Sequence, residues 1–487
     1  MNGFIKKSSV VIIALTAFNI YAQPTPKQLS SEGYVQSMDE STQSRLNSKA
    51  LHLNDVIEQG LRKNYDQQIR KYNSEILDLK WDDTWEDFWV PNVNISLISP
   101  EHRLGTLKSG SNNATPRETR PDGALALNFG DYTIFNWGKD YLQYLSTKAD
   151  IKRSKEQISE ASRELKHDLI VSYFKLYFLK ERERIKRDQL RHASFIYRLN
   201  REKISLKKVS KQDYYLARSE YLRAQNEFHE AKNDVQLQNE VIANSINDEV
   251  GTKYVLQDSL RYELLTTPLD EIIRLASINN PETLDALKDV ENAKRGYELA
   301  LKNNLPLPKI SMKLGAYDYR FSPDTNRTTY STGPGNSNID IVASINATWS
   351  LTGTGGLLNG RATRSSLLSK HVAFAKKAQA TRDSKALIKS QYFTVKHLQN
   401  QINILDARIP TLQKSFDTIL ENYMNKRTKY LDFKNTLIEL TDAQILLEQS
   451  KFLHLYNKIG LAKTAGVEDF PGQNFENLIQ KYKKGKK

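Results

Sequence analysis

The stretch that decides the fold is IDIVASINATWSL, residues 339–351. Every second residue in it is apolar: Ile339, Ile341, Ala343, Ile345, Ala347, Trp349 and Leu351. The residues between them are polar, except for Val342. Because successive side chains of a strand point to opposite faces, this pattern predicts a β-strand with one apolar and one polar face. At about 3.3 Å per residue it would extend roughly 40 Å, which is longer than most strands of soluble sheets.

Three further stretches alternate in the same way. They are NVNISLI (92–98), ALALNFGDYTIFNW (124–137) and KISMKLGAYDYRF (309–321). Loops rich in Gly, Ser, Asn and Pro separate the strands of each pair, which is typical of exposed connections. Aromatic residues collect near the strand ends, namely Trp89, Phe135, Trp137, Tyr317, Tyr319, Phe321 and Trp349. They form either an interfacial girdle of the kind found on membrane barrels or caps on a small sheet.

The rest of the chain has the composition of long, solvated helices. Hydrophobic residues make up 39% and charged residues 26% of the 487 residues, with only 14 Pro and 21 Gly. The mean hydropathy is −0.60. Few core-forming residues combined with few helix breakers favour narrow helical packing over a compact globular enzyme.

The sequence indicates an internal duplication. LNDVIEQGLRKNY (53–65) aligns without gaps on LDEIIRLASINNP (269–281), at an offset of 216 residues. Two later pairs lie at an offset of 219, Tyr173-Phe174 with Tyr392-Phe393 and Asp213-Tyr214 with Asp432-Phe433. Because these offsets differ by only three residues, they predict a repeated unit of about 217 residues, which is far longer than the repeat of a solenoid protein.

Each copy has the same predicted order of elements. A short amphipathic helix precedes a second helix (66–88 and 282–302), which proline stops at Pro91 or at Pro306 and Pro308. Two strands and two long helices follow. A coiled-coil pattern with spacings of four and three marks the first copy: Ile158, Ser162, Leu165, Leu169, Ser172, Leu176 and Leu179. In the second copy, 364–466 contains one proline, Pro410, and roughly 80 helical residues would extend on the order of 120 Å.

The N-terminus, MNGFIKKSSVVIIALTAFNIYAQ, predicts a secretory signal peptide over 1–22, with an N-terminal anchor as the alternative. We divide the remainder into a polar segment (23–50), a first repeat (51–266), a second repeat (267–466) and a basic tail (467–487). The chain has no cysteine, which excludes disulfides, metal–thiolate sites and a lipid-modified Cys anchor. No later run reaches the roughly 18 to 20 apolar residues of a transmembrane helix. An exported chain of this kind either stays in solution or enters a membrane by strands.

No catalytic or cofactor-binding pattern is found, so we expect neither an enzyme nor a cofactor. None of the eight histidines has HxxxH or HExxH spacing, and GTGG (353–356) lacks the GK[ST] of a phosphate loop. The formal charge is +14, or +12 without 1–22, but basic residues alternate with acidic ones, as in KERERIKRDQLR (180–191). Such alternation indicates solvated helix faces with i,i+4 pairs rather than a nucleic-acid site.

Four strands cannot close a barrel in lipid. Every backbone N–H and C=O must be paired there, and a sheet of four strands leaves two unpaired edges. The smallest membrane barrels have about eight strands. We therefore predict an obligate oligomer in which three copies supply twelve strands.

In these features the chain resembles the TolC-like outer-membrane efflux proteins over nearly all of its mature length. The motifs are the L-x-[DE]-[VI]-I-x(6)-N openings, the proline-stopped helices, the glycine-containing strand exits IFNWGKD (134–140) and SLTGTGG (350–356), and the helix starts SKQDYYLARSEYLRAQNEF (210–228) and RTKYLDFKNTLIELTDAQ (427–444). The resemblance implies a mainly α fold with transmembrane β, in which long antiparallel coiled-coil helices form an α-barrel. Each chain would add four strands to a shared 12-stranded trimeric β-barrel. It also implies a location in the cell outer membrane with a periplasmic extension, and two partners, a periplasmic adaptor and an inner-membrane pump or secretion ATPase.

The resemblance also places a periplasmic tip at the two helix-to-helix turns. The candidate residues for adaptor docking or gating are Lys207, Ser210, Asp213, Lys426, Arg427 and Asp432. Family members carry glycine where this chain has Lys207 and Lys426, and lysine tolerates a left-handed turn less well. Asp213 and Asp432 either gate the tip or begin helices, where the dipole favours a carboxylate.

Two functions remain open from the sequence. The first is a passive exit duct, a homotrimeric outer-membrane channel of a tripartite efflux pump or type I secretion system. The second is a soluble periplasmic coiled-coil scaffold whose strands form an accessory sheet. Extraction separates them, because only the duct would need detergent.

Overall fold

The structure is a computed structural model that describes residues 48–90, 94–98, 124–205, 209–318, 340–349, 359–425, 427–477 and 479–481. The chain divides into two units, Met1–Lys49 and Ala50–Lys487. The elements below lie in the second unit, except that β1 (Ser48–Leu51) begins in the first. The predicted signal peptide lies outside the described residues.

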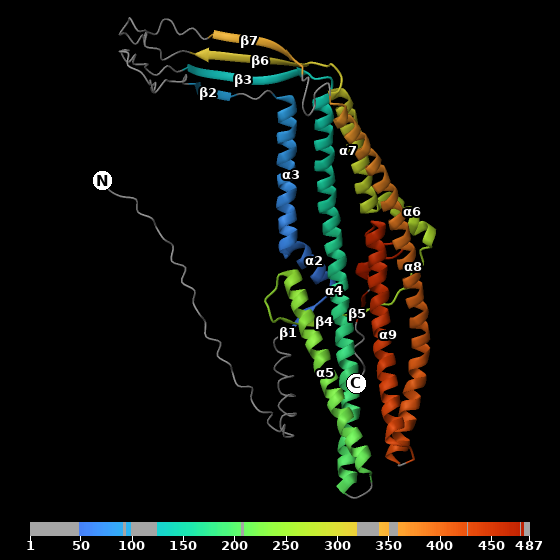
Figure 1. Cartoon of the computed structure of the whole chain (residues 1–487). Coiled ribbons are helices and arrows are strands. Elements are labelled where there is room, and N and C mark those ends of the chain that lie inside the picture. Colours follow the sequence, from blue (N-terminus) through green and yellow to red (C-terminus); the bar gives the residue numbers. More distant parts are fainter. Residues whose placement is uncertain are drawn as a thin grey trace, which may run out of the picture. The chain divides into compact units, whose positions relative to one another are not determined.

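One antiparallel sheet contains all four predicted strands, in the order β2-β3-β6-β7 (Figure 1). The strands are β2 (Asn94–Ile98), β3 (Ala124–Phe135), β6 (Lys309–Asp318) and β7 (Asp340–Thr348). The register places four apolar residues in one row across the whole sheet, namely Ile95, Leu127, Ala316 and Ile341. All four alternating stretches are therefore strands of this one sheet, which confirms the strand predictions.

Strand β7 is shorter than the sequence pattern predicts. It has nine residues, or about 30 Å, and ends at Thr348, so Trp349 lies beyond it. The reason lies in its partner, because Thr348 pairs with Lys309, the first residue of β6. Pro308 precedes Lys309 and has no N–H to donate to a further ladder bond.

Eight α-helices occupy most of the described chain. They are α2 (Leu53–Lys63), α3 (Tyr65–Trp89), α4 (Lys139–Ser205), α5 (Lys211–Ile246), α6 (Leu269–Asn279), α7 (Pro281–Asn303), α8 (Gly360–Met424) and α9 (Tyr430–Ala465). With 67 residues, α4 is about 100 Å long. Both α4 and α8 run away from the sheet and turn back as hairpins, α4/α5 and α8/α9 (Figure 1). No helix in the described parts of the chain is long and apolar enough to cross a membrane.

The long helices lie side by side in a single layer. Helices α3 and α5 pack on α4, α4 packs on α7 and α9, and these two pack on α8. The layer therefore has two edges, one formed by α3 and α5 and the other by α8 (Figure 1). Small elements complete the fold: β4 (Lys253–Leu256) pairs with β1, β5 (Asp258–Leu260) pairs with β8 (Ile479–Lys481), and Phe475–Asn477 form a 3-10 turn.

The main core lies where the short helices meet the middle of the long ones. The coiled-coil pattern predicted in α4 contributes Leu169, Leu176 and Leu179, all buried. Gly60 of α2 rests directly on Leu169, because a Cβ at position 60 would lie 2.4 Å from a methyl group of that leucine. A glycine here allows α2 to approach α4 closely.

Two asparagines join helices end to end. Asn64 caps the start of α3 by accepting a hydrogen bond from Asp66 N (2.8 Å), and its amide donates to Ser245 O in the last turn of α5 (2.9 Å). Asn280 caps α7 in the same way through Thr283 N (2.8 Å) and donates to Thr464 O of α9 (2.7 Å). Each side chain thus satisfies an N–H group of one helix and a C-terminal carbonyl of the next.

Candidate functional site at the hairpin ends and layer edges

The turn that starts α5 is built by two of the predicted tip residues. Ser210 is the N-cap of α5, where its hydroxyl oxygen accepts from Asp213 N (3.0 Å) and its hydroxyl donates to the Asp213 carboxylate (2.9 Å). The positive N-terminal end of the helix dipole also stabilises a carboxylate in the first turn. The structure therefore gives Asp213 a role in starting the helix.

A buried polar link joins the two hairpins near their ends. Tyr423, in the last turn of α8, donates its hydroxyl to Asn200 of α4 over 2.8 Å, and both side chains are buried. Burial raises the pKa of Tyr423, and the negative charge of Asp213 raises it further.

An apolar cluster surrounds this link. Its buried members come from all four hairpin helices: Ile196, Ala217, Phe416, Tyr423, Tyr430, Phe433, Leu437 and Leu440. The rings of Tyr423 and Phe433 stack with centroids 5.7 Å apart. Aromatic pairs of this kind contribute roughly 0.5 to 1.5 kcal/mol beyond their buried area. The cluster holds the two hairpins together close to their free ends.

An ion pair adds to this contact between hairpins. Glu220 of α5 is only 3% exposed, and its carboxylate lies 3.6 Å from Lys434 Nζ of α9. Arg223 donates to the same carboxylate at 2.5 Å. Two cations around one buried carboxylate compensate part of its desolvation cost.

The remaining predicted tip residues have different positions. Arg427, in the turn between α8 and α9, and Asp432, in the first turn of α9, are both exposed. Lys207 and Lys426 lie outside the described residues. The structure thus brings Ser210 and Asp213 together, whereas the roles of all six in docking or gating stay predictions.

The residues that join the hairpins were not predicted from the sequence. Asn200, Tyr423, Tyr430 and Glu220 were not among the candidates. The aromatic spacing of Phe416, Tyr423, Tyr430 and Phe433 was a signal available in the sequence. It did not say which helix these rings would face.

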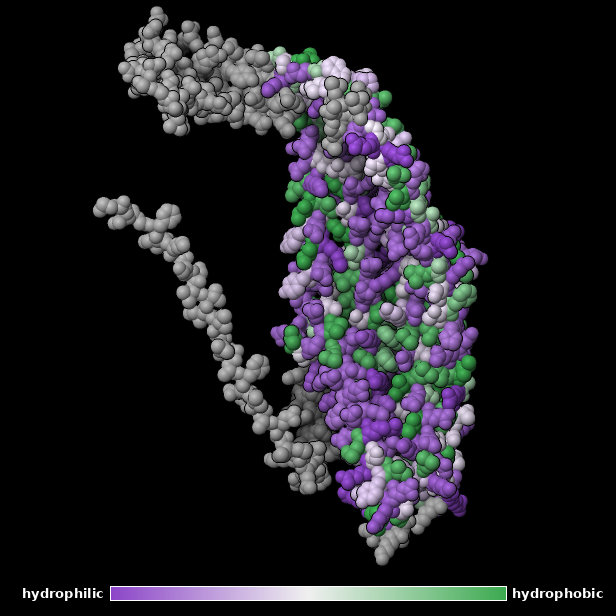
Figure 2. All heavy atoms as spheres, viewed as in Figure 1, coloured by the Kyte–Doolittle hydropathy of each residue, from purple (hydrophilic) through white to green (hydrophobic). Residues whose placement is uncertain are grey.

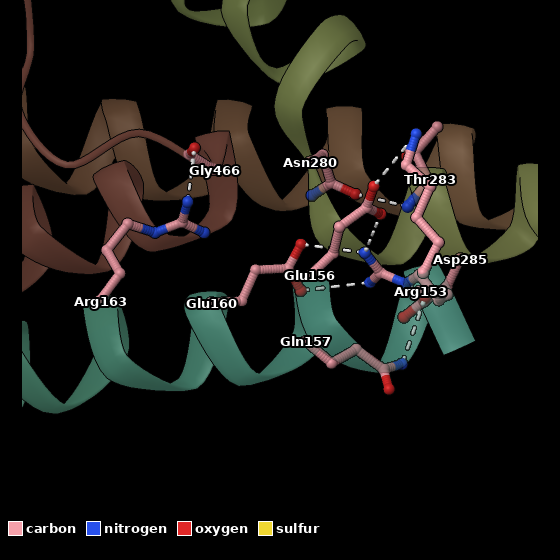
Figure 3. Close-up of polar contacts among 10 residues, drawn as sticks. Arg153, Glu156, Gln157, Glu160, Arg163, Asn280, Thr283, Asp285 and Gly466 are labelled. Carbon is pink, nitrogen blue, oxygen red and sulfur yellow. Dashed lines mark hydrogen bonds and ion pairs between the residues drawn. The ribbon is translucent and has the colours of Figure 1, made fainter. Parts of the chain in front are cut away.

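A second buried ion cluster joins α4 to α7, one from each predicted repeat (Figure 3). The guanidinium of Arg153 on α4 binds both carboxylate oxygens of Glu160 at 3.1 Å and also donates to Asp285 of α7. The Asp285 hydrogen bond, with the other carboxylates, raises the pKa of Arg153, so this arginine stays charged although it is 7% exposed. A paired buried arginine of this kind orients the two helices against each other.

The two edges of the helical layer carry exposed apolar stripes. On α3 the stripe has the coiled-coil spacings of four and three, and its members are 54% to 64% exposed: Tyr65, Ile69, Tyr72, Ile76 and Leu79. On α8 the exposed stripe includes Leu368, Val372, Phe393 and Ile404. Figure 2 shows hydrophobic side chains among hydrophilic ones along the face of the helices that it presents. Such stripes are typical of helices that pack against another helix.

Comparison with known proteins gives matches in structure only. No protein-family profile and no curated protein matches the sequence. The solved structure of the Campylobacter jejuni CmeC outer membrane channel aligns with a TM-score of 0.70 and 16% identity over 87% of this chain and 87% of that one. The Vibrio cholerae outer membrane protein VceC aligns with a TM-score of 0.65 and 16% identity over 85% and 96%.

A third channel gives the same result. The Neisseria gonorrhoeae MtrE outer membrane channel aligns with a TM-score of 0.64 and 13% identity over 85% of this chain and 89% of that one. The three alignments each cover at least 85% of this chain. The chain therefore has the fold of the TolC-like outer-membrane channels, as the resemblance in its sequence implied.

Proposed function

We propose that the chain is one protomer of a homotrimeric outer-membrane channel, the passive exit duct of a tripartite efflux pump or type I secretion system. Its sheet would complete a 12-stranded barrel with two further copies, and its helices would extend the duct into the periplasm. A periplasmic adaptor and an inner-membrane pump or secretion ATPase would supply the energy and the substrate.

The observation that carries this proposal is that the edges of the sheet and of the helical layer coincide. Helix α3 leads to the edge strand β2, and the edge strand β7 leads to α8 at the other edge. Because neighbouring strands alternate in direction, β7 of one copy would lie antiparallel to β2 of the next. The same head-to-tail contact would bring the α8 stripe against the α3 stripe. A repeated contact between two different faces closes into a ring when the rotation from copy to copy completes a full turn, as three steps of 120° would do.

Disulfide cross-linking tests this contact, because the chain has no cysteine of its own. Ile76 on α3 and Val372 on α8 lie about 20 Å from the sheet on their stripes and are 59% and 54% exposed. The double variant I76C/V372C, oxidised in detergent, is expected to give covalent dimers and trimers on a denaturing gel. Within one chain the two positions lie on opposite edges of the layer and cannot bond.

The single variants I76C and V372C are the matched controls. Each is expected to remain a monomer on the gel, since in a head-to-tail ring a residue of one edge does not meet its own copy. A double variant that stays monomeric would refute the ring. Cross-linked dimers in a single variant would instead indicate a two-fold contact and a different assembly.

Adaptor docking at the tip is tested by charge reversal. Lys211, Arg427 and Lys429 are exposed near the hairpin turns. Their replacement by Glu is expected to weaken co-purification with the cognate adaptor, because the three positive charges that the adaptor surface would complement become negative. Unchanged co-purification would rule out a docking role for these charges.

A further inference from the structure

The two edge helices of the layer carry opposite charge. Helix α3 has seven Asp and Glu residues against three Lys and Arg. In α8, residues 360–397 include nine Lys and Arg against one Asp. In the described parts of the chain, the ion pairs of these two helices are Asp78–Lys155 and Arg408–Glu439, so most of the excess charge is not neutralised by an ion pair there. The two edges are therefore electrostatically complementary to each other.

Charged residues continue both apolar stripes toward the sheet. Asp83 and Asp87 lie seven and eleven residues after Ile76, within about 20° of it around α3. Arg364 lies four residues before Leu368, about 40° from it around α8. The two aspartates and the arginine are exposed. At its end next to the sheet, the α3 stripe is therefore acidic and the α8 stripe is basic.

The charged ends of the two stripes lie at the same level along the layer. The ring of Phe88, in the last turn of α3, lies 6.2 Å from that of Tyr141 at the start of α4. Lys302, at the end of α7, lies next to the turn that precedes α4. Thr363, in the first turn of α8, donates to Ala300 O at the end of α7 over 3.3 Å. The end of α3 and the start of α8 are thus level, although they belong to opposite edges (Figure 1).

A closed ring preserves this level from copy to copy. Each copy is related to the next by a rotation about one axis, without a shift along it. Asp87 directly precedes Phe88, and Arg364 directly follows Thr363. When the α3 stripe of one copy meets the α8 stripe of the next, Asp87 and Arg364 therefore lie opposite each other.

We infer that Asp87 of one copy forms an ion pair with Arg364 of the next copy, an inference that rests on the proposed function. The pair sets which edge meets which. Contact between two α3 edges would oppose two clusters of carboxylates, and contact between two α8 edges would oppose two clusters of cations. The apolar parts of the stripes cannot make this distinction, because the hydrophobic effect has no direction.

Charge reversal in the I76C/V372C background tests the pair, since the cross-link reports the contact between copies. D87R and R364D each place like charges opposite one another, and each is expected to slow the formation of covalent dimers on the order of tenfold at low salt. D87R/R364D exchanges the two charges and is expected to restore the rate to within about twofold. The matched control is D82R, an exposed position about 140° around α3 from Asp87, which is expected to leave the rate unchanged.

The outcomes separate this inference from the proposed function. If I76C/V372C gives no covalent dimers in any background, the ring and the pair are both refuted. If it gives them at the same rate in the reversed variants, the pair is refuted and the ring is not.

Two further results would also overturn the pair. One is a double variant that stays as slow as D87R or R364D, and the other is equal slowing by D82R. Circular dichroism checks the helix content of each variant. Where a reversal lowers it, D87N and R364Q take its place, and D87N/R364Q is then expected to be no slower than either single variant.

Discussion

Gly466, at the residue scale, allows two helix ends to meet. It is the C-cap of α9 with a φ of 72°, and a Cβ at this position would lie 2.0 Å from the backbone oxygen of Asn279. The equivalent position in the first predicted repeat is Asn247, which also ends its helix in the left-handed region, at a φ of 53°. Both residue types are the ones that tolerate this conformation.

Replacement of Gly466 by Ala is therefore expected to destabilise the chain more than the same change at Gly472. Gly472 has a φ of 76°, but a Cβ added there would meet nothing within 4 Å, so only the conformational cost of roughly 1 to 2 kcal/mol applies. Gly466→Ala adds a clash with backbone. Thermal unfolding in detergent, followed by circular dichroism, compares the two variants. Equal midpoints would mean that the approach of Asn279 is not needed for stability.

His454 makes the chain sensitive to acid. It is 2% exposed on α9, and Gln399 of α8 donates to its ring nitrogen Nε2 over 3.2 Å. Burial, together with the positive charges of Lys458 and Lys396, lowers its pKa to about 3. Because the folded chain binds this proton more weakly than the unfolded chain, the free energy of unfolding falls as pH drops from about 6.5 toward 3.

We expect His454→Gln to reduce this loss of stability. The slope from one such group is at most about 1.4 kcal/mol per pH unit. The measurement is the shift of the unfolding midpoint between pH 7 and pH 5, in the variant and in the unmodified chain. A shift of the same size in both would show that His454 is not the group that titrates.

At the scale of the elements, two asparagines connect helices end to end. Asn64 and Asn280 hold α3 and α7 on the ends of α5 and α9, so that pairs of shorter helices match the length of α4 and α8. Aligned in this way, the positive end of one helix meets the negative end of the next. The same bond pattern in both halves is what a duplication would produce, although the predicted repeat boundaries stay untested.

The series Asn280→Ser and Asn280→Ala separates the two functions of this residue. Serine retains the N-cap acceptor but lacks the amide that reaches Thr464, whereas alanine loses both. The expected order of thermal midpoints is unmodified chain, then serine, then alanine, with alanine costing about 1 to 2 kcal/mol. A serine variant as stable as the unmodified chain would show that the link to α9 contributes nothing.

At the scale of the whole molecule, we expect the exposed apolar stripe of α3 to control the association of copies. Ile76→Asp places a charge in the proposed contact between copies, where its desolvation is costly. Lys71→Asp, at an exposed position about 140° around α3 from Ile76, is the matched control. Light scattering in detergent is expected to give a trimer for Lys71→Asp and a smaller species for Ile76→Asp, with unchanged helix content in both. A trimer in both variants would place the contact elsewhere.

Much of the fold could be predicted from local patterns. The four strands follow from alternation, α3 and α7 were predicted to within one residue at each end, and the buried face of α4 follows from its spacing. The length of β7 was overestimated, because alternation continues past the last residue that has a partner. The α3 stripe of Tyr65, Ile69, Tyr72, Ile76 and Leu79 has spacing that the sequence displays openly. The stripe was not predicted to be exposed, because the spacing of apolar residues does not indicate whether another helix packs on them.

By itself, the sequence determined the elements of this protein, because the period of apolar residues is a local property. Only the tertiary structure decided the pairing of β3 with β6, the contact of Tyr423 with Asn200 and the pairing of Arg153 with Asp285. Each of these joins residues more than a hundred positions apart. Such contacts depend on how the helices rotate and which neighbour they meet, and no short-range pattern encodes that choice.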